Sequence, residues 1–146
     1  QDRHWRAIAA KFDTIAKVEA RHEQAHVEDA EALVVAFGSA AKFVEYVVAE
    51  LRAEGHRIGW FRPVTLWPFP GEALAKATAG ARRVLVFELN AGQMLDDVLI
   101  HAADRSAVRF IGGVSIAESG LAYGELMDAP VIRDRILAAV GEGTRS

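Results

Sequence analysis

The sequence predicts a three-layer α/β/α domain, with helices on both faces of a mainly parallel sheet. Four short apolar runs of strand length alternate with segments whose apolar residues recur every three or four positions. Strands that alternate with helices in this way form parallel βαβ units with right-handed crossovers. If the strands are numbered along the chain, their simplest winding gives the spatial order 2-1-3-4.

The first predicted element is a helix from residue 4 to about residue 26. Its apolar stripe consists of Trp5, Ile8, Phe12 and Ile15. A helix with such a stripe normally packs it on a neighbour. We therefore expect residues 1–28 to be an N-terminal helix and linker, and residues 29–146 to be the α/β domain.

The four strands are predicted from apolar runs, which suit strands buried on both faces of a parallel sheet. They span residues 32–37, 57–62, 83–88 and 107–111. Helices are expected over residues 40–54, 72–78, 94–104 and 131–140. Pro63 should end the second strand, because proline cannot donate to a ladder. Residues 115–128, with two glycines, are expected to form a loop.

The composition excludes several kinds of function. The 146 residues contain no cysteine, which rules out disulfides, a cysteine nucleophile and iron–sulfur ligation within the chain. The net charge of −3 gives no reason to expect nucleic acid or an anionic membrane as a partner. No signal-peptide pattern is present, so we expect a cytoplasmic location. The chain starts without methionine and is expected to be a piece of a longer protein.

The predicted strand order places a crevice beyond the carboxyl ends of the first and third strands. Ligands of open α/β sheets bind at such a topological switch point. The lining residues would be Gly38, Ser39, Glu88, Asn90, Gly92 and Gln93. They could bind phosphate, CoA or a nucleotide, or order a loop of a partner. Local roles stay open as well: Ser39 and Asn90 could cap helices, and Glu88 could pair with an arginine.

Aromatic residues are dense around the end of the second strand. We expect Trp60 and Phe61 to lie in the core. Trp67 and Phe69, which follow in a proline-rich segment, are expected partly at an interface with another domain or subunit, because large aromatics dominate such contacts. Thr65 belongs to the same segment and is grouped with this candidate interface.

Residues 22–26 match the H-E-x-x-H zinc pattern. On a helix, this spacing would place His22 and His26 on one face, with Glu23 as a general base. The match lies at the polar end of the predicted helix, and a solvated helix end is the interpretation we favour. We therefore expect no metal site, and keep a zinc peptidase as an alternative hypothesis that metal analysis would decide.

Three strings resemble one enzyme family in order and spacing: residues 33–39 (LVVAFGS), 62–70 (RPVTLWPFP) and 88–94 (ELNAGQM). They are similar to the α subunit of 2-oxoacid:ferredoxin oxidoreductases, most of all to the 2-oxoglutarate and ketoisovalerate members. The resemblance covers about residues 28–140 and weakens after Gly113.

The resemblance implies the C-terminal domain of that α subunit, with a fold like the C-terminal domain of transketolase. The family decarboxylates 2-oxoacids oxidatively to acyl-CoA with thiamine diphosphate and Mg²⁺, and passes electrons through iron–sulfur clusters to ferredoxin. This chain has no Gly-Asp-Gly motif and no cysteine. We therefore expect no cofactor and no catalytic residue in it, and expect those groups in the parent complex.

The resemblance also implies partners: the N-terminal part of the same α subunit, the β and other oxidoreductase subunits, and ferredoxin indirectly. An accessory, interface-forming role is the function we favour. Two alternatives remain, a small-ligand-binding α/β module and the C-terminal domain of a transketolase or an E1β-type thiamine enzyme.

Overall fold

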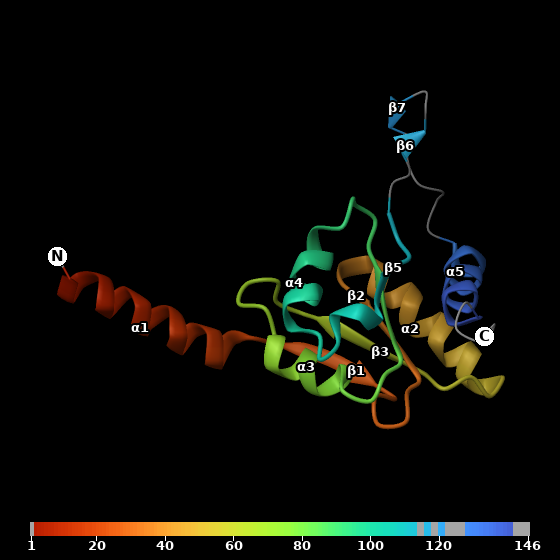
Figure 1. Ribbon diagram of the computed structural model, residues 1–146, viewed down its shortest axis with the longest axis horizontal. Helices are drawn as coiled ribbons and strands as arrows, with labels where there is room; N and C mark the ends of the chain where they lie inside the picture. The colour runs from red at the N-terminus through yellow and green to blue at the C-terminus, as the bar shows by residue number, and fades with distance from the viewer. Residues whose placement is uncertain (1, 114–115, 118–119, 122–127, 142–146) are drawn as a thin grey trace.

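The computed structural model describes residues 2–113, 116–117, 120–121 and 128–141 (Figure 1). The helices are α1 (Asp2–Glu19), α2 (Gly38–Ala53), α3 (Gly71–Thr78), α4 (Gln93–His101) and α5 (Ala129–Gly141), with a short 3-10 turn η1 (Arg105–Ala107). The strands are β1 (His22–Ala25), β2 (Ala32–Ala36), β3 (Ile58–Pro63), β4 (Arg83–Phe87), β5 (Val108–Phe110), β6 (Ile116–Ala117) and β7 (Gly120–Leu121).

The main sheet has the strand order β1-β3-β2-β4-β5, and β3, β2, β4 and β5 run parallel. The four predicted strands are β2, β3, β4 and β5 in chain order. Their order in the sheet, β3-β2-β4-β5, is the predicted order 2-1-3-4, so the predicted winding is confirmed. The central strand β2 is buried along its whole length. Its Leu33 lies opposite Gly59 of β3 and Val84 of β4. A strand with neighbours on both edges and helices on both faces must be apolar throughout, as this one is.

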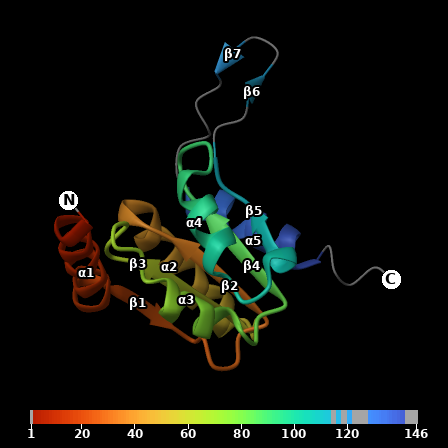
Figure 2. The ribbon, with the colours of Figure 1, turned by 60° about the vertical axis from the view of Figure 1, so that its left-hand side comes forward.

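Helices cover both faces of the sheet and create two separate cores (Figure 2). On one face, α2 and α5 pack over Val34 and Leu85. On the other face, α3 and α4 pack over Leu33 and Val86. The three-layer α/β/α prediction is therefore confirmed. In the described part of the chain, no helix combines the length and hydropathy of a membrane span.

The prediction of one helix up to residue 26 is wrong. The helix α1 ends at Glu19, and His22–Ala25 form β1, which pairs antiparallel with β3 at the sheet edge. The pairing brings the backbone of His26 against Gly59, where a Cβ would overlap the His26 carbonyl oxygen. His26 itself has a φ of 57°, which turns the chain out of the strand.

The loop predicted over residues 115–128 contains a small antiparallel hairpin, so a plain loop is wrong for its described part. Ile116 pairs with Leu121, and Ala117 pairs with Gly120. Residues 115, 118–119 and 122–127 lie outside the described residues. The hairpin β6–β7 projects from the body beyond the end of β5 (Figure 1).

Arg52 of α2 clamps the turn between β1 and β2. Its Nη1 donates to Asp29 Oδ2 at 2.8 Å, its Nη2 donates to Asp29 Oδ1, and its Nε donates to the Ile58 carbonyl at 2.7 Å. The hydrogen bonds from the Arg52 side chain lower the pKa of Asp29 from 3.8 to about 2, because they favour the charged carboxylate. This clamp links the edge strand to the helical layer.

We expect Asp29→Asn to lower the urea midpoint of unfolding at pH 7, by an amount that depends on pH. Because the pKa of Asp29 is lower in the folded chain, the stabilisation is present above about pH 4 and is lost as the pH falls through 2. The midpoints of variant and wild type should therefore converge near pH 2. Asp13→Asn, at an exposed α1 carboxylate, is the control and should show no such convergence. A difference for Asp29→Asn that stays constant down to pH 2 would contradict the clamp.

Candidate functional site

The predicted switch-point residues do lie at one edge of the sheet, because β2 and β4 are parallel neighbours. Glu88 follows β4 directly and is fully buried. Its Oε2 accepts a hydrogen bond from the Met94 N–H at 2.9 Å, and its Oε1 accepts one from the Leu95 N–H at 3.1 Å. The carboxylate thus caps the N-terminus of α4, where a negative charge also interacts favourably with the helix dipole. Among the described residues, the carboxylate of Glu88 binds these amides, and the arginine pairing considered for it is not seen.

The neighbouring loop completes this cap. Asn90 Oδ1 accepts hydrogen bonds from the N–H groups of Gly92 at 3.1 Å and Gln93 at 3.3 Å, and Asn90 Nδ2 donates to Gln93 Oε1 at 3.2 Å. Gly92 has a φ of +100°, which only glycine adopts without strain. The first amides of α4 are therefore bound to the protein's own oxygens. A phosphate could bind there only by displacing Glu88.

The other side of the crevice lacks the predicted cap. The helix α2 begins at Gly38 with a φ of +61°, its N-cap residue is Phe37, and no side chain caps it. The capping role considered for Ser39 is therefore wrong. Gly38 and Ser39 are both exposed. Neither residue carries a charged group that would fix a ligand.

The aromatic segment after β3 divides between core and surface. Phe61 is buried as predicted, and Trp60 is half-buried against the core. Trp67 is 65% exposed. The ring of Phe12 from α1 packs edge-on against it, with the two ring centroids 5.6 Å apart. Phe69 is half-buried and stacks on His101 at 5.5 Å. This contact ties the segment to the end of α4.

Thr65 has a structural role that the sequence did not indicate. Its Oγ1 donates to the Pro68 carbonyl at 2.9 Å and accepts from the Arg21 N–H at 2.9 Å. The Val64 N–H also donates to the Arg21 carbonyl at 2.9 Å. Thr65 therefore fixes the connection between α1 and β1 against the aromatic segment.

The zinc motif loses the helical geometry on which it depends. His22 and Glu23 are adjacent in a strand, where successive side chains point to opposite faces. The His22 ring stacks on Phe61 at 5.0 Å, and Glu23 pairs with Arg62 at 3.0 Å. His26 lies beyond the strand in the left-handed turn. Within the described ranges, no group of three histidine, cysteine, aspartate or glutamate side chains is placed to hold a metal ion.

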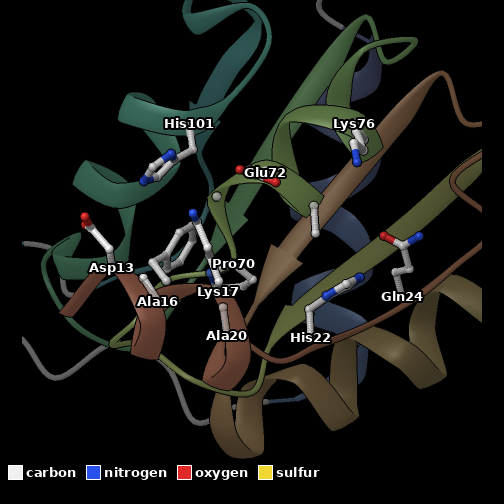
Figure 3. A pocket seen from close by; sticks show the side chains of 13 residues that line it. Asp13, Ala16, Lys17, Ala20, His22, Gln24, Pro70, Glu72, Lys76 and His101 are labelled. Atoms are coloured by element: carbon white, nitrogen blue, oxygen red, sulfur yellow. The ribbon is translucent and has the colours of Figure 1, made fainter. Parts of the chain in front are cut away.

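A groove of about 810 Å³ separates α1 from the body of the domain (Figure 3). Its polar lining comes from α1, β1, α3 and the end of α4: Asp13, Lys17, His22, Gln24, Glu72, Lys76 and His101. The Lys17 side chain extends from α1 toward the α4 wall, where His101 lies. Two lysines and two carboxylates cancel in charge, and the lining contains no serine, threonine or cysteine nucleophile. The sequence could not indicate this groove, because four separate segments form it.

The fold and this edge define the class of the protein: a transketolase C-terminal-like α/β domain whose switch-point loop is closed by its own side chains. Residues 30–119 match the family model described as pyruvate:ferredoxin oxidoreductase core domain II. The chain belongs to this family, as core domain II of the α subunit of 2-oxoacid:ferredoxin oxidoreductases.

Curated relatives agree with this assignment. The chain is 33% identical over 108 residues to the ketoisovalerate oxidoreductase subunit VorB of Methanothermobacter marburgensis, covering 73% of this chain and 31% of that subunit. It is 39% identical over 70 residues to the 2-oxoglutarate synthase subunit KorA of Methanocaldococcus jannaschii, covering 48% of this chain and 19% of that subunit. The chain thus spans less than a third of the length of these relatives.

Solved structures confirm the fold. A 2-oxoglutarate:ferredoxin oxidoreductase from Magnetococcus marinus superposes with a TM-score of 0.70 at 22% identity, over 88% of this chain and 21% of that one. A split-gene transketolase superposes with a TM-score of 0.58 at 18% identity, over 78% of this chain and 39% of that one. The predicted likeness to the transketolase C-terminal domain is therefore confirmed at the level of fold.

Proposed function

We propose that this chain is an accessory domain of a thiamine-dependent 2-oxoacid:ferredoxin oxidoreductase, with a structural and interface role and no bond-breaking role of its own. The observation that carries the proposal is the buried Glu88 carboxylate, which occupies the N-terminus of α4 at the switch point. Ligands of α/β sheets usually bind at this position. In this chain the amides that would bind a ligand are already bound by the Glu88 carboxylate.

The described residues do not fit thiamine diphosphate or an iron–sulfur cluster. The sequence lacks cysteine, and no metal-holding set is present in the part that the structure describes. In this proposal, those cofactors belong to the rest of the parent enzyme. The partners are the N-terminal part of the α subunit and the β and other subunits, with ferredoxin as an indirect partner.

The ferredoxin-linked family is a better parent than transketolase or an E1β-type enzyme. Residues 30–119 match the pyruvate:ferredoxin oxidoreductase domain model, and a ketoisovalerate oxidoreductase subunit is 33% identical over 108 residues. The transketolase likeness is one of fold, at 18% identity. The substrate of the parent enzyme is accordingly proposed to be a 2-oxoacid.

Calorimetry of the chain with thiamine diphosphate and Mg²⁺ tests the proposal, and we expect no heat of binding. We also expect no turnover of 2-oxoglutarate or 2-oxoisovalerate with CoA and a dye acceptor. The complete oxidoreductase, assayed in parallel, should give both signals. Micromolar binding of thiamine diphosphate by the chain alone would overturn the accessory role.

A further inference from the structure

Exposed apolar side chains gather at the carboxyl edge of the sheet. Val64, Leu66 and Trp67 follow β3, Phe43 lies in the first turns of α2 after β2, Leu89 follows β4, and Phe110 ends β5. Their exposed fractions run from 37% for Phe110 to 65% for Trp67. Because β3, β2, β4 and β5 are consecutive parallel neighbours, these positions follow one edge of the sheet. We call this set the carboxyl-edge surface.

The helix α1 extends the carboxyl-edge surface. None of its 18 residues is buried, and Trp5 and Phe12 of its apolar stripe are 63% and 49% exposed. A lone amphipathic helix of this length is marginal in water, because helices in proteins are stabilised mainly by packing their apolar face. The contact between Phe12 and Trp67 joins the stripe to the surface. The apolar stripe of α1 is therefore left largely exposed by the contacts of the described residues, and we expect another surface to pack on it.

The arrangement of these elements fits a folded partner. Figure 1 shows α1 and the β6–β7 hairpin projecting from the body near opposite ends of the carboxyl edge. Three of the six residues of the surface are aromatic, Phe43, Trp67 and Phe110, and aromatic residues are enriched in the centre of protein interfaces. Isolated exposed apolar residues need no explanation, but a row of six beside an uncovered helix does.

We infer that the carboxyl-edge surface and the α1 stripe bind the remainder of the same α subunit. This inference rests on the proposed function. The matching segment is 31% of the VorB subunit and 21% of the 2-oxoglutarate:ferredoxin oxidoreductase chain, so most of each relative lies outside it. A partner in the same polypeptide binds at high effective concentration, so an interface made of the carboxyl-edge surface and one helix suffices for it.

Hydroxyl-radical footprinting of the complete α subunit, against the 146-residue chain, tests this inference. Trp5, Phe12 and Trp67 should be oxidised several-fold more slowly in the complete subunit. Ile100, which is 68% exposed on α4 and outside the surface, is the control and should react equally in both. Unchanged oxidation of Trp5 and Trp67 in a complete subunit that still supports turnover would overturn the inference and leave the proposed function intact.

A substitution separates docking from folding. Trp67→Ser should leave the melting temperature of the 146-residue chain nearly unchanged, because the side chain is mostly exposed there. In the complete α subunit the same variant should restore fast oxidation of Trp5 and Phe12. Protection that appears with rising concentration of the chain alone would identify a second copy as the occupant. Protection that needs the β subunit would identify that subunit, and either result overturns the assignment.

Discussion

Glu88→Ala should destabilise the chain by about 3 kcal/mol, because it leaves two amides of α4 without acceptors where the wild type gives them a carboxylate. The Met94 bond is itself buried, so water cannot easily replace it. Chemical unfolding followed by tryptophan fluorescence measures the free energy of unfolding. Hydrogen exchange should in addition show that the N–H groups of Met94 and Leu95 lose protection before the amides of β4 do.

Two variants at the same loop test whether the charge or the shape of Glu88 is responsible. Glu88→Gln keeps one acceptor oxygen but turns an NH₂ group toward an N–H donor, so we expect a loss between that of wild type and Glu88→Ala. Asn90→Ala removes a neutral and partly exposed cap, and should cost about 1 kcal/mol. If Glu88→Ala cost no more than Asn90→Ala, the proposed closure of the switch point by a buried carboxylate would be wrong.

The sheet could be predicted because its signals are local. The run over residues 32–37 is apolar at every position, which fits a central parallel strand, and alternation with helices then fixes the winding. The edge strand β1 could not be predicted in this way. His22–Ala25 form a polar segment, and their conformation is set by pairing with β3, which lies more than 30 residues away in the sequence. The last residue of the apolar stripe is Ile15, so the prediction of helix up to residue 26 went further than the stripe supports.

The chemistry of the candidate site was only partly predictable. Glu88, Asn90 and Gly92 were predicted as site residues from their position at the switch point, and the structure places them together. The cap itself was missed, because Glu88 reaches amides six and seven residues ahead, whereas a capping box spans three. One signal was available. A carboxylate that directly follows four buried apolar strand residues, as Glu88 follows residues 84–87, is carried into the interior and must find donors there.

The backbone of Gly112, which follows β5, lies directly against the backbone of Glu88. A Cβ on Gly112 would lie 2.5 Å from the Glu88 backbone nitrogen and would also overlap the Glu88 carbonyl oxygen. The Gly113 N–H donates to that same carbonyl at 2.7 Å. The backbone after β5 thus rests directly on the start of the capping loop. If either segment moves, the hydrogen bond between the Gly113 N–H and the Glu88 carbonyl breaks.

Gly112→Ala should therefore destabilise the chain by roughly 3 kcal/mol, at the upper end of the cost of overpacking, since the clash is with backbone and no rotamer change relieves it. The displaced segment carries Glu88, so the amides of Met94 and Leu95 should lose protection from hydrogen exchange in this variant too. The double variant Glu88→Ala/Gly112→Ala should lose less free energy of unfolding than the sum of the two single losses. Both substitutions disrupt the same cap, in which Glu88 binds the first amides of α4.

Gly80→Ala is the matched control for this effect. A Cβ at Gly80 would meet nothing within 4 Å, and its φ lies outside the left-handed region, so the free energy of unfolding should stay within about 1 kcal/mol of wild type. Equal losses for Gly80→Ala and Gly112→Ala would mean that the contact with the Glu88 backbone does not account for the cost, because Gly80 makes no such contact. A loss confined to Gly112→Ala, with the exchange signature at α4, would show that β5 holds the Glu88 loop closed. The closed loop would then depend on two strands that are neighbours only in the folded sheet.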